Sequence, residues 1–95
     1  MPILESDVER KLVRELKKLD IKHVKMQAIA QKGYPDRLIL LQGGKAIFIE
    51  LKSPGRENNL SAHQVQVIDM LRKLGFQVLV SSSVEECLAW IKEQS

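Results

Sequence analysis

The spacing of apolar residues divides the chain into three helices and four strands. In three segments apolar side chains recur every three or four positions, which is typical of a helix with one buried face. In four others they form short runs, which are typical of strands. The predicted order is helix 6–19, strands 22–32, 36–41 and 45–52, helix 61–74, strand 76–80 and helix 82–94.

Each predicted helix begins with a polar pair that can cap its first turn. A serine followed three residues later by Glu or Gln satisfies two backbone N–H groups reciprocally. The pairs are Ser6 with Glu9, Ser61 with Gln64, and Ser83 with Glu86. Gly75 follows the second helix, where glycine is a frequent C-terminal cap. The helix boundaries are therefore marked in the sequence itself.

The strand at 45–52 is apolar on both of its faces. Ile47, Ile49 and Leu51 alternate with Ala46 and Phe48. A strand buried on both sides needs covering layers on both sides, so helices should flank the sheet. The segment from this strand through the second helix to the fourth strand is a strand–helix–strand unit, which joins parallel strands by a right-handed crossover. We therefore expect an α/β fold with a central mixed four-stranded sheet between helices.

The composition narrows the class of protein without identifying its chemistry. A chain of 95 residues fits one domain, residues 1–95, near the small end of what folds alone. One cysteine excludes an internal disulfide and suits a reducing cytoplasm. No apolar stretch approaches the roughly 20 residues of a membrane span, and the first residues do not resemble a secretion signal. The net charge of +3 favours an anionic partner.

Charged residues stand where the third strand should be buried. Glu50 and Lys52 lie on the same side of this strand as Phe48. Burying such side chains costs free energy unless they are paired or bind a metal. Asp36 begins the preceding strand, so a hairpin would bring a second carboxylate close to Glu50.

The length of the hairpin loop decides which residue lies opposite Glu50. If the loop is Gly43-Gly44 alone, Arg37 takes that position. If the loop also includes Gln42, Asp36 lies opposite Glu50 and the two carboxylates share a face. Three-residue loops use a glycine in the left-handed region, which this loop can supply. The sequence allows both pairings, and only the longer loop makes a paired-carboxylate site.

Two carboxylates on one face repel each other unless a cation lies between them. Their oxygens suit Mg²⁺, with Mn²⁺ as a substitute, and such ions also take water and phosphate oxygens as ligands. On the first helix Glu5 falls near the centre of the apolar face and should point inward, which makes it a further candidate ligand. Glu9 lies nearer the edge of that face and already has a role as the capping partner of Ser6.

These residues form a pattern that resembles the PD-(D/E)xK nucleases, and within them the VRR-NUC family. The resemblance rests on Gly33 to Asp36, Glu50 to Lys52, the loop glycine Gly55, and Leu60, Ser61 and Gln64. The opening stretch of residues 4–13 also resembles the first helix of that family. The likeness covers nearly the whole chain. The insert of residues 56–59 departs from the pattern and bears on substrate contacts, not on the catalytic positions.

The resemblance implies a metal-dependent DNA endonuclease of the stand-alone phage or bacterial type, at work in the cytoplasm of a bacterium or an infected host. Asp36, Glu50 and the backbone carbonyl of Leu51 would hold the metal, and Lys52 would serve the attacking water. Glu5 would match the first-helix acid and Gln64 the glutamine near the site. The likeness to Holliday-junction resolvases implies a homodimer that acts on four-way or other branched DNA, with no small-molecule cofactor.

Basic residues supply candidate contacts to DNA phosphates. They are Lys11 and Lys18 on the outward face of the first helix, Lys32 and Arg37 around the Asp36 motif, and Arg56 in the loop after Lys52. Trp90 lies off the apolar face of the last helix, where it would either anchor an interface or cover the edge of the core.

Other interpretations of the same residues stay open at this point. Asp36 after a proline is a common turn residue, Gln64 can be a cap alone, and Glu5 can be a solvated residue before the helix. The chain as a whole could be a nucleic-acid-binding module without activity, or an interaction subunit of a phage replication or repair complex. A cleavage assay with Mg²⁺ tests the first of these classes, and a size measurement of the purified chain, alone and with partners, tests the second.

Overall fold

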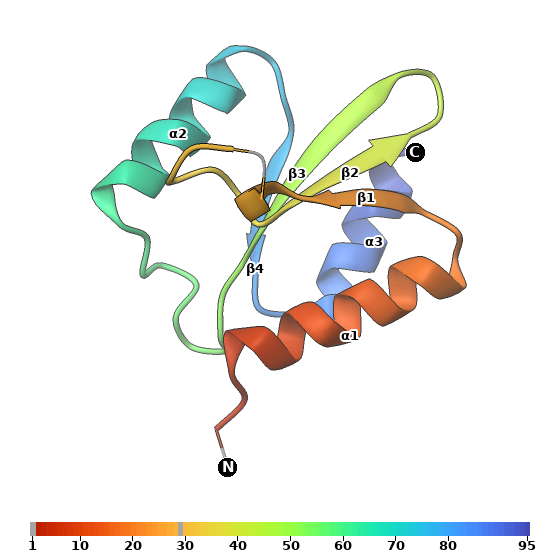
Figure 1. Ribbon diagram of the computed structural model, residues 1–95, viewed down its shortest axis with the longest axis horizontal. Helices are drawn as coiled ribbons and strands as arrows, with labels where there is room; N and C mark the ends of the chain where they lie inside the picture. Colours follow the sequence, from red (N-terminus) through yellow and green to blue (C-terminus); the bar gives the residue numbers. More distant parts are fainter. Residues whose placement is uncertain (1, 29) are drawn as a thin grey trace.

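The computed structural model describes residues 2–28 and 30–95 and has the predicted order of elements (Figure 1). The order α-β-β-β-α-β-α is confirmed. A short 3₁₀ helix, η1, interrupts the chain after the first strand. The elements are α1 (Glu5–Lys18), β1 (Lys22–Lys25), η1 (Met26–Ala28), β2 (Arg37–Leu41), β3 (Lys45–Leu51), α2 (Ala62–Lys73), β4 (Val78–Ser81) and α3 (Val84–Gln94).

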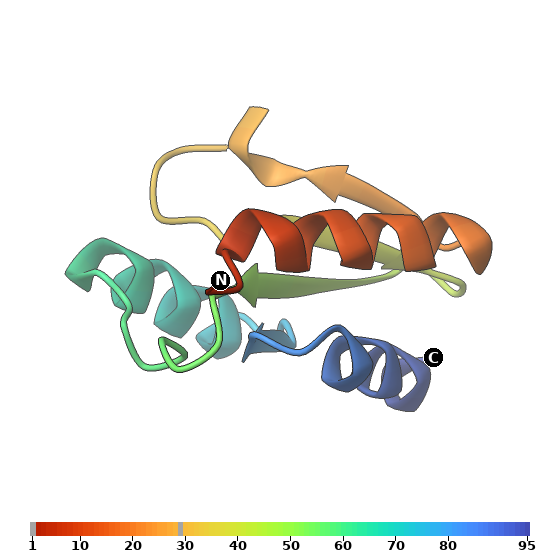
Figure 2. The same ribbon diagram turned by 90° about the horizontal axis from the view of Figure 1, so that it is seen from below.

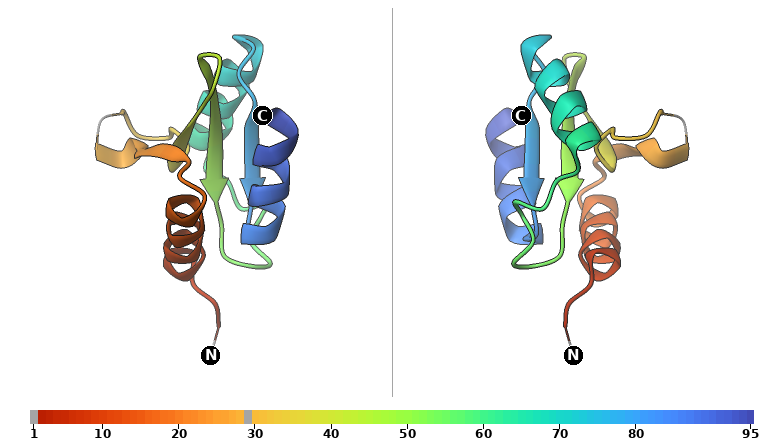
Figure 3. Two further views of the ribbon diagram at one scale, coloured as in Figure 1. Left: turned by 90° about the vertical axis from the view of Figure 1, so that its right-hand side faces the viewer. Right: turned by 90° about the vertical axis from the view of Figure 1, so that its left-hand side faces the viewer.

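The four strands form one mixed sheet in the order β1-β2-β3-β4. β1 pairs with β2 and β2 with β3 in antiparallel fashion, whereas β3 and β4 are parallel and point the same way in Figure 3. Helix α2 connects the two parallel strands and lies on one side of the sheet, while α1 and α3 lie on the other (Figure 1). The expected mixed sheet between helices is therefore present.

Two apolar clusters hold the helices to the two faces of β3. Ile47, Ile49 and Leu51 pack with side chains of α1 and α3, and Phe48 packs with side chains of α2. Trp90 is half-buried and packs against the first cluster, so it covers the edge of the core. Apolar burial of this kind contributes roughly 25 cal/mol per Å² and is the main force that fixes the layers.

The hairpin between β2 and β3 has the three-residue loop. Leu41 pairs with Lys45, which leaves Gln42, Gly43 and Gly44 in the loop. Both glycines have positive φ, 83° and 74°, a backbone conformation that other residues adopt only with strain. Because the register continues through Arg37 opposite Ile49, the residue before β2 faces Glu50.

The start of α1 and the end of β1 differ from the prediction. Helix α1 begins at Glu5 instead of after Ser6, because the carboxylate of Asp7 accepts a hydrogen bond from the Leu4 N–H at 2.9 Å and caps the first turn. The strand predicted for residues 22–32 ends at Lys25, because the chain turns into η1; position 29 of that prediction lies outside the described residues. Among the helices described, none is long and apolar enough to cross a membrane.

Candidate active site

The carboxyl groups of Asp36 and Glu50 meet where β2 begins and β3 ends. Asp36 precedes β2 directly, and its Oδ2 accepts a hydrogen bond from the Leu51 N–H at 2.8 Å. Glu50 lies on the neighbouring strand with only 3% of its surface exposed. The hairpin register and this backbone hydrogen bond together fix both acids on one face of the sheet.

Burial makes both acids hard to ionise. It raises the pKa of Glu50 to about 8, and the negative charge of Asp36 adds to the effect. Burial also raises the pKa of Asp36, although the hydrogen bond from the Leu51 N–H acts in the opposite direction. A site that holds two carboxyl groups against their own repulsion favours a bound cation, which would relieve both costs.

Lys52 and Gln64 complete a hydrogen-bonded group around Glu50. The Lys52 Nζ lies 3.5 Å from the Glu50 Oε2 and donates to the Gln64 Oε1 at 3.2 Å. The Gln64 Nε2 donates to the Glu50 Oε2 at 2.8 Å. The Lys52 side chain is only 12% exposed, so its ammonium is held within this group and is largely shielded from solvent.

Gln64 also caps α2, as the sequence predicted. Its Oε1 accepts from the Ser61 N–H at 3.0 Å, and its own N–H donates to the Ser61 Oγ at 3.1 Å. The capping and the contact with the charged pair therefore coexist in one side chain. As a result, the start of α2 is tied directly to the ends of the Glu50 and Lys52 side chains.

Of the two acids at the start of α1, Glu5 faces the site. Glu9 forms an ion pair with Arg37, with 3.1 Å between the Arg37 Nη2 and the Glu9 Oε2, and does not cap α1 as predicted. Glu5 is exposed to solvent, although its helical position places it on the apolar face of α1. It lines the same cavity as Asp36, and burial and the negative charge of Asp36 raise its pKa, whereas Lys52 acts in the opposite direction. Figure 2 shows the start of α1 beside the end of β3.

The donor atoms at this site suit a hard divalent cation. Across residues 2–28 and 30–95, no three or more His, Cys, Asp or Glu side chains converge as a metal site, so Glu5 does not complete a ligand set with Asp36 and Glu50. Two carboxylates leave the other positions to a backbone carbonyl, water and phosphate oxygens. That mixture is usual for Mg²⁺ and unusual for zinc, which takes nitrogen and sulfur ligands.

The basic candidates for DNA contact lie in different surroundings. Arg37 is 11% exposed, is held by Glu9 and lies 3.3 Å from the His23 Nδ1, so its guanidinium is not presented to a partner. Lys18 is at the far end of α1, about 20 Å along the helix from Glu5. Lys32 and Arg56 are exposed, and each belongs to a segment that carries a site residue.

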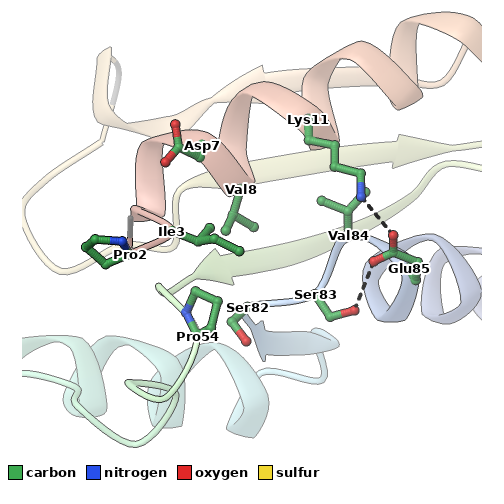
Figure 4. A pocket seen from close by; sticks show the side chains of 10 residues that line it. All are labelled: Pro2, Ile3, Asp7, Val8, Lys11, Pro54, Ser82, Ser83, Val84 and Glu85. Atoms are coloured by element: carbon green, nitrogen blue, oxygen red, sulfur yellow. Dashed lines mark hydrogen bonds and ion pairs between the residues drawn. The ribbon is translucent and has the colours of Figure 1, made fainter.

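Lys11 lines a separate hollow of about 660 Å³ (Figure 4). Its Nζ pairs with the Glu85 Oε1 at 2.8 Å, and the apolar side chains of Ile3, Val8 and Val84 line the same hollow. None of the acids Glu5, Asp36 or Glu50 lines this hollow. The Lys11 ammonium therefore serves to join α1 to α3.

The backbone at Gly33 explains why a glycine precedes the Pro-Asp pair. Its φ is +95°, and a Cβ atom there would lie 2.5 Å from the His63 Cδ2 and 3.1 Å from the His63 carbonyl oxygen. The segment that carries Asp36 thus packs directly on the first turn of α2, which carries Gln64. The sequence shows Gly33 as part of a motif, and the close approach to His63 gives the physical reason why a glycine is needed there.

Gly33→Ala is expected to destabilise the fold by about 2–4 kcal/mol, because it adds both a steric overlap and backbone strain. Gly55→Ala is the matched control. Gly55 also has a positive φ, +87°, but a Cβ there meets nothing within 4 Å, so the cost should be about 1 kcal/mol. Urea unfolding of both variants measures the difference, and equal losses would contradict the close packing on His63.

An Asp at the start of one strand and Glu-x-Lys at the end of its antiparallel neighbour, in this α-β-β-β-α-β-α order, define a nuclease core of the PD-(D/E)xK type. The model of the VRR-NUC domain matches residues 4–85, and the chain belongs to the VRR-NUC family. It is 37% identical over 81 residues, 85% of each chain, to "Putative nuclease p44" of Acyrthosiphon pisum secondary endosymbiont phage 1. No solved structure matches the chain. The family resemblance in the sequence is thereby confirmed.

Proposed function

We propose that this protein is a metal-dependent DNA endonuclease that hydrolyses phosphodiester bonds. The observation that carries the proposal is the pairing of half-buried Asp36 with buried Glu50 on one face, with Lys52 held beside them. Membership of the VRR-NUC family and the name of the phage relative support the same activity. A purely structural pair would gain nothing from two carboxyl groups whose ionisation is opposed by burial and by each other.

Asp36, Glu50 and the backbone carbonyl of Leu51 would hold the cation, with Mg²⁺ as the natural choice and Mn²⁺ as a substitute. When bound, the cation supplies a water of lowered pKa and stabilises negative charge on the phosphate. Lys52 either orients the attacking water or donates to the charge that grows on the phosphate in the transition state. Gln64 keeps the ammonium in place, because its Oε1 accepts from Nζ at 3.2 Å.

Glu5 would act from outside the ligand set. It lies near Asp36 and Lys52 but does not join Asp36 and Glu50 in a three-carboxylate cluster. A carboxylate in that position would accept hydrogen bonds from water around the cation and the substrate. Lys32 and Arg56 would contact the DNA backbone on either side of the site.

The chain offers little surface for sequence-specific recognition, so we propose selection by DNA structure, with four-way or other branched junctions as substrates. The decisive experiment incubates the protein with labelled duplex, flap, splayed and four-way DNA of one sequence in Mg²⁺ or Mn²⁺. We expect metal-dependent internal cuts, faster on branched DNA. Binding without any cut on any substrate would instead favour a nucleic-acid-binding module without activity.

The protein is expected to be a homodimer, because two cuts in a junction require two sites. A stable interface needs roughly 1,200–2,000 Å² of buried surface, and exposed apolar side chains such as Leu19, Val65 and Leu74 are available to contribute. Sedimentation equilibrium at tens of micromolar should give twice the mass of the chain without DNA, and the mass of two chains plus one junction when junction DNA is added. A monomer under both conditions would contradict this expectation.

A further inference from the structure

A cavity of about 460 Å³ opens beside Asp36, between the start of α1 and the segment that joins β1 to β2. Its lining includes the acids Glu5 and Asp36 and the side chains of Gln27, Gln31 and Tyr34. The joining segment reaches out past the start of α1 in Figure 2. The cavity therefore adjoins the place where the scissile phosphate would lie in the proposed nuclease.

Backbone hydrogen bonds hold the wall of this cavity in place. The Met26 N–H donates to the Asp36 carbonyl at 2.9 Å, which closes the segment at its base. The Ala30 N–H donates to the Met26 carbonyl at 2.8 Å, and Gly33 packs on the first turn of α2. Tyr34 also packs against the apolar cluster around Phe48. The cavity is thus part of the fold, anchored on the same residue that carries the proposed metal ligand.

The charges around the cavity select the kind of group that can enter it. The lining carries the ammonium of Lys32 as well as the carboxyl groups of Glu5 and Asp36, and the two acids disfavour a phosphate inside the cavity itself. The two glutamine amides each offer a donor and an acceptor, and Tyr34 offers an aromatic ring. A neutral, flat group with a polar edge fits these walls, and an unpaired nucleobase has both a ring face and a hydrogen-bonding edge.

We propose that this cavity binds an unpaired nucleobase next to the scissile phosphate. The proposal rests on the nuclease function proposed above and adds the feature of DNA that the site selects. A paired and stacked base cannot enter, because it must first leave the helix at a cost of a few kcal/mol. Lys32, on the rim, would hold the phosphate of the same nucleotide outside the cavity. Flaps, splayed arms and bulges offer such a base directly, whereas a four-way junction offers one only when a pair opens.

The test compares two duplexes that differ in one group only. Both contain one extra, unpaired nucleotide at the same position; in one it is thymidine and in the other an abasic residue. Binding is measured by fluorescence anisotropy in EDTA, where metal-dependent cleavage does not run. The thymidine duplex should bind about 5- to 100-fold more tightly, since loss of one stacked base typically has an effect of this size.

Gln31→Ala should remove part of this preference. We expect the variant to bind the thymidine duplex about 5-fold more weakly, because the Gln31 amide no longer contacts the base. Its affinity for the abasic duplex should not change, since that duplex offers no base for the amide to contact. Gln66→Ala is the matched control, since Gln66 is an exposed glutamine on α2 outside the cavity lining. It should change neither affinity.

Equal affinity for the thymidine and abasic duplexes would overturn the proposal, as would an equal loss for both in Gln31→Ala. Cleavage in Mg²⁺ is measured separately on the same duplexes. If both duplexes are cut at equal rates and bound equally, the nuclease function stands and the base site does not. If neither is cut but thymidine is preferred, the base site stands and the nuclease function fails.

Discussion

Lys52→Ala is expected to reduce the rate of DNA cleavage by a factor of about 10² to 10³ while leaving DNA binding nearly unchanged. Removing one group that acts on the charge of the transition state typically has an effect of this size. Binding is carried by many phosphate contacts, so one lysine contributes little to it. The ammonium of Lys52 lies beside Glu50 and Gln64 and is only 12% exposed, which favours a role in the reaction over a role in attraction of DNA.

Single-turnover cleavage measured beside gel-shift binding tests this expectation. Lys73→Ala is the control, because Lys73 is 77% exposed on α2 and pairs only with Asp69. Asp36→Asn should also stop cleavage, but through weakened metal binding, so raised Mn²⁺ should restore part of its activity and none of that of Lys52→Ala. A wild-type rate for Lys52→Ala would show that the Glu50–Lys52 stretch is not the catalytic one.

Glu50→Gln is expected to abolish cleavage and, without metal, to stabilise the fold. The pKa of Glu50 is about 8 in the folded protein against an ordinary value of 4.5. The stability that this group contributes in its protonated form is fully present below pH 4.5 and is lost as the pH rises through 8. Glutamine keeps the shape and cannot ionise, so the variant should avoid this loss.

Urea unfolding in EDTA at pH 5 and pH 8.5 measures the effect. The advantage of Glu50→Gln over the wild type should be on the order of 1–3 kcal/mol larger at the higher pH. Mg²⁺ should raise the stability of the wild type and not that of the variant. Glu93→Gln, at an exposed acid on α3, is the control, and the same growth with pH there would show that the effect is not specific to Glu50. A Glu50 variant whose advantage does not change with pH would contradict the raised pKa.

The sequence predicted the elements whose signals are local. The apolar spacing of α2, its Ser61 and Gln64 cap and the two-sided burial of β3 each depend on neighbouring residues, and all three are present. The pairing across the hairpin is not local in this sense. Gly43 and Gly44 suit a loop of two or three residues, so the sequence does not decide on which face of the sheet Asp36 lies. The pairing of Leu41 with Lys45 in the folded sheet decides it.

Long-range partners escaped prediction for the same reason. Glu9 matches a capping pattern with Ser6, and nothing near it in the chain announces that it pairs with Arg37, 28 residues away. Glu5 shares the helix face of Val8, but it is the first residue of α1 and lines the open cavity beside Asp36, so it stays exposed. The cavity beside Asp36 was not predicted either, because Gln27 and Gln31 belong to a stretch whose pattern predicted a strand, whereas the strand ends at Lys25.

The double use of Gln64 has a consequence for how this protein is made. The hairpin with Asp36, Glu50 and Lys52 leaves the ribosome before the start of α2. Strand β4, against which α2 packs, leaves later still. Until α2 docks, the Lys52 ammonium lacks the amide that orients it. A nascent or partly degraded chain would therefore carry the acids of a nuclease without its assembled geometry, and only the finished fold would be able to damage the DNA of the cell that makes it.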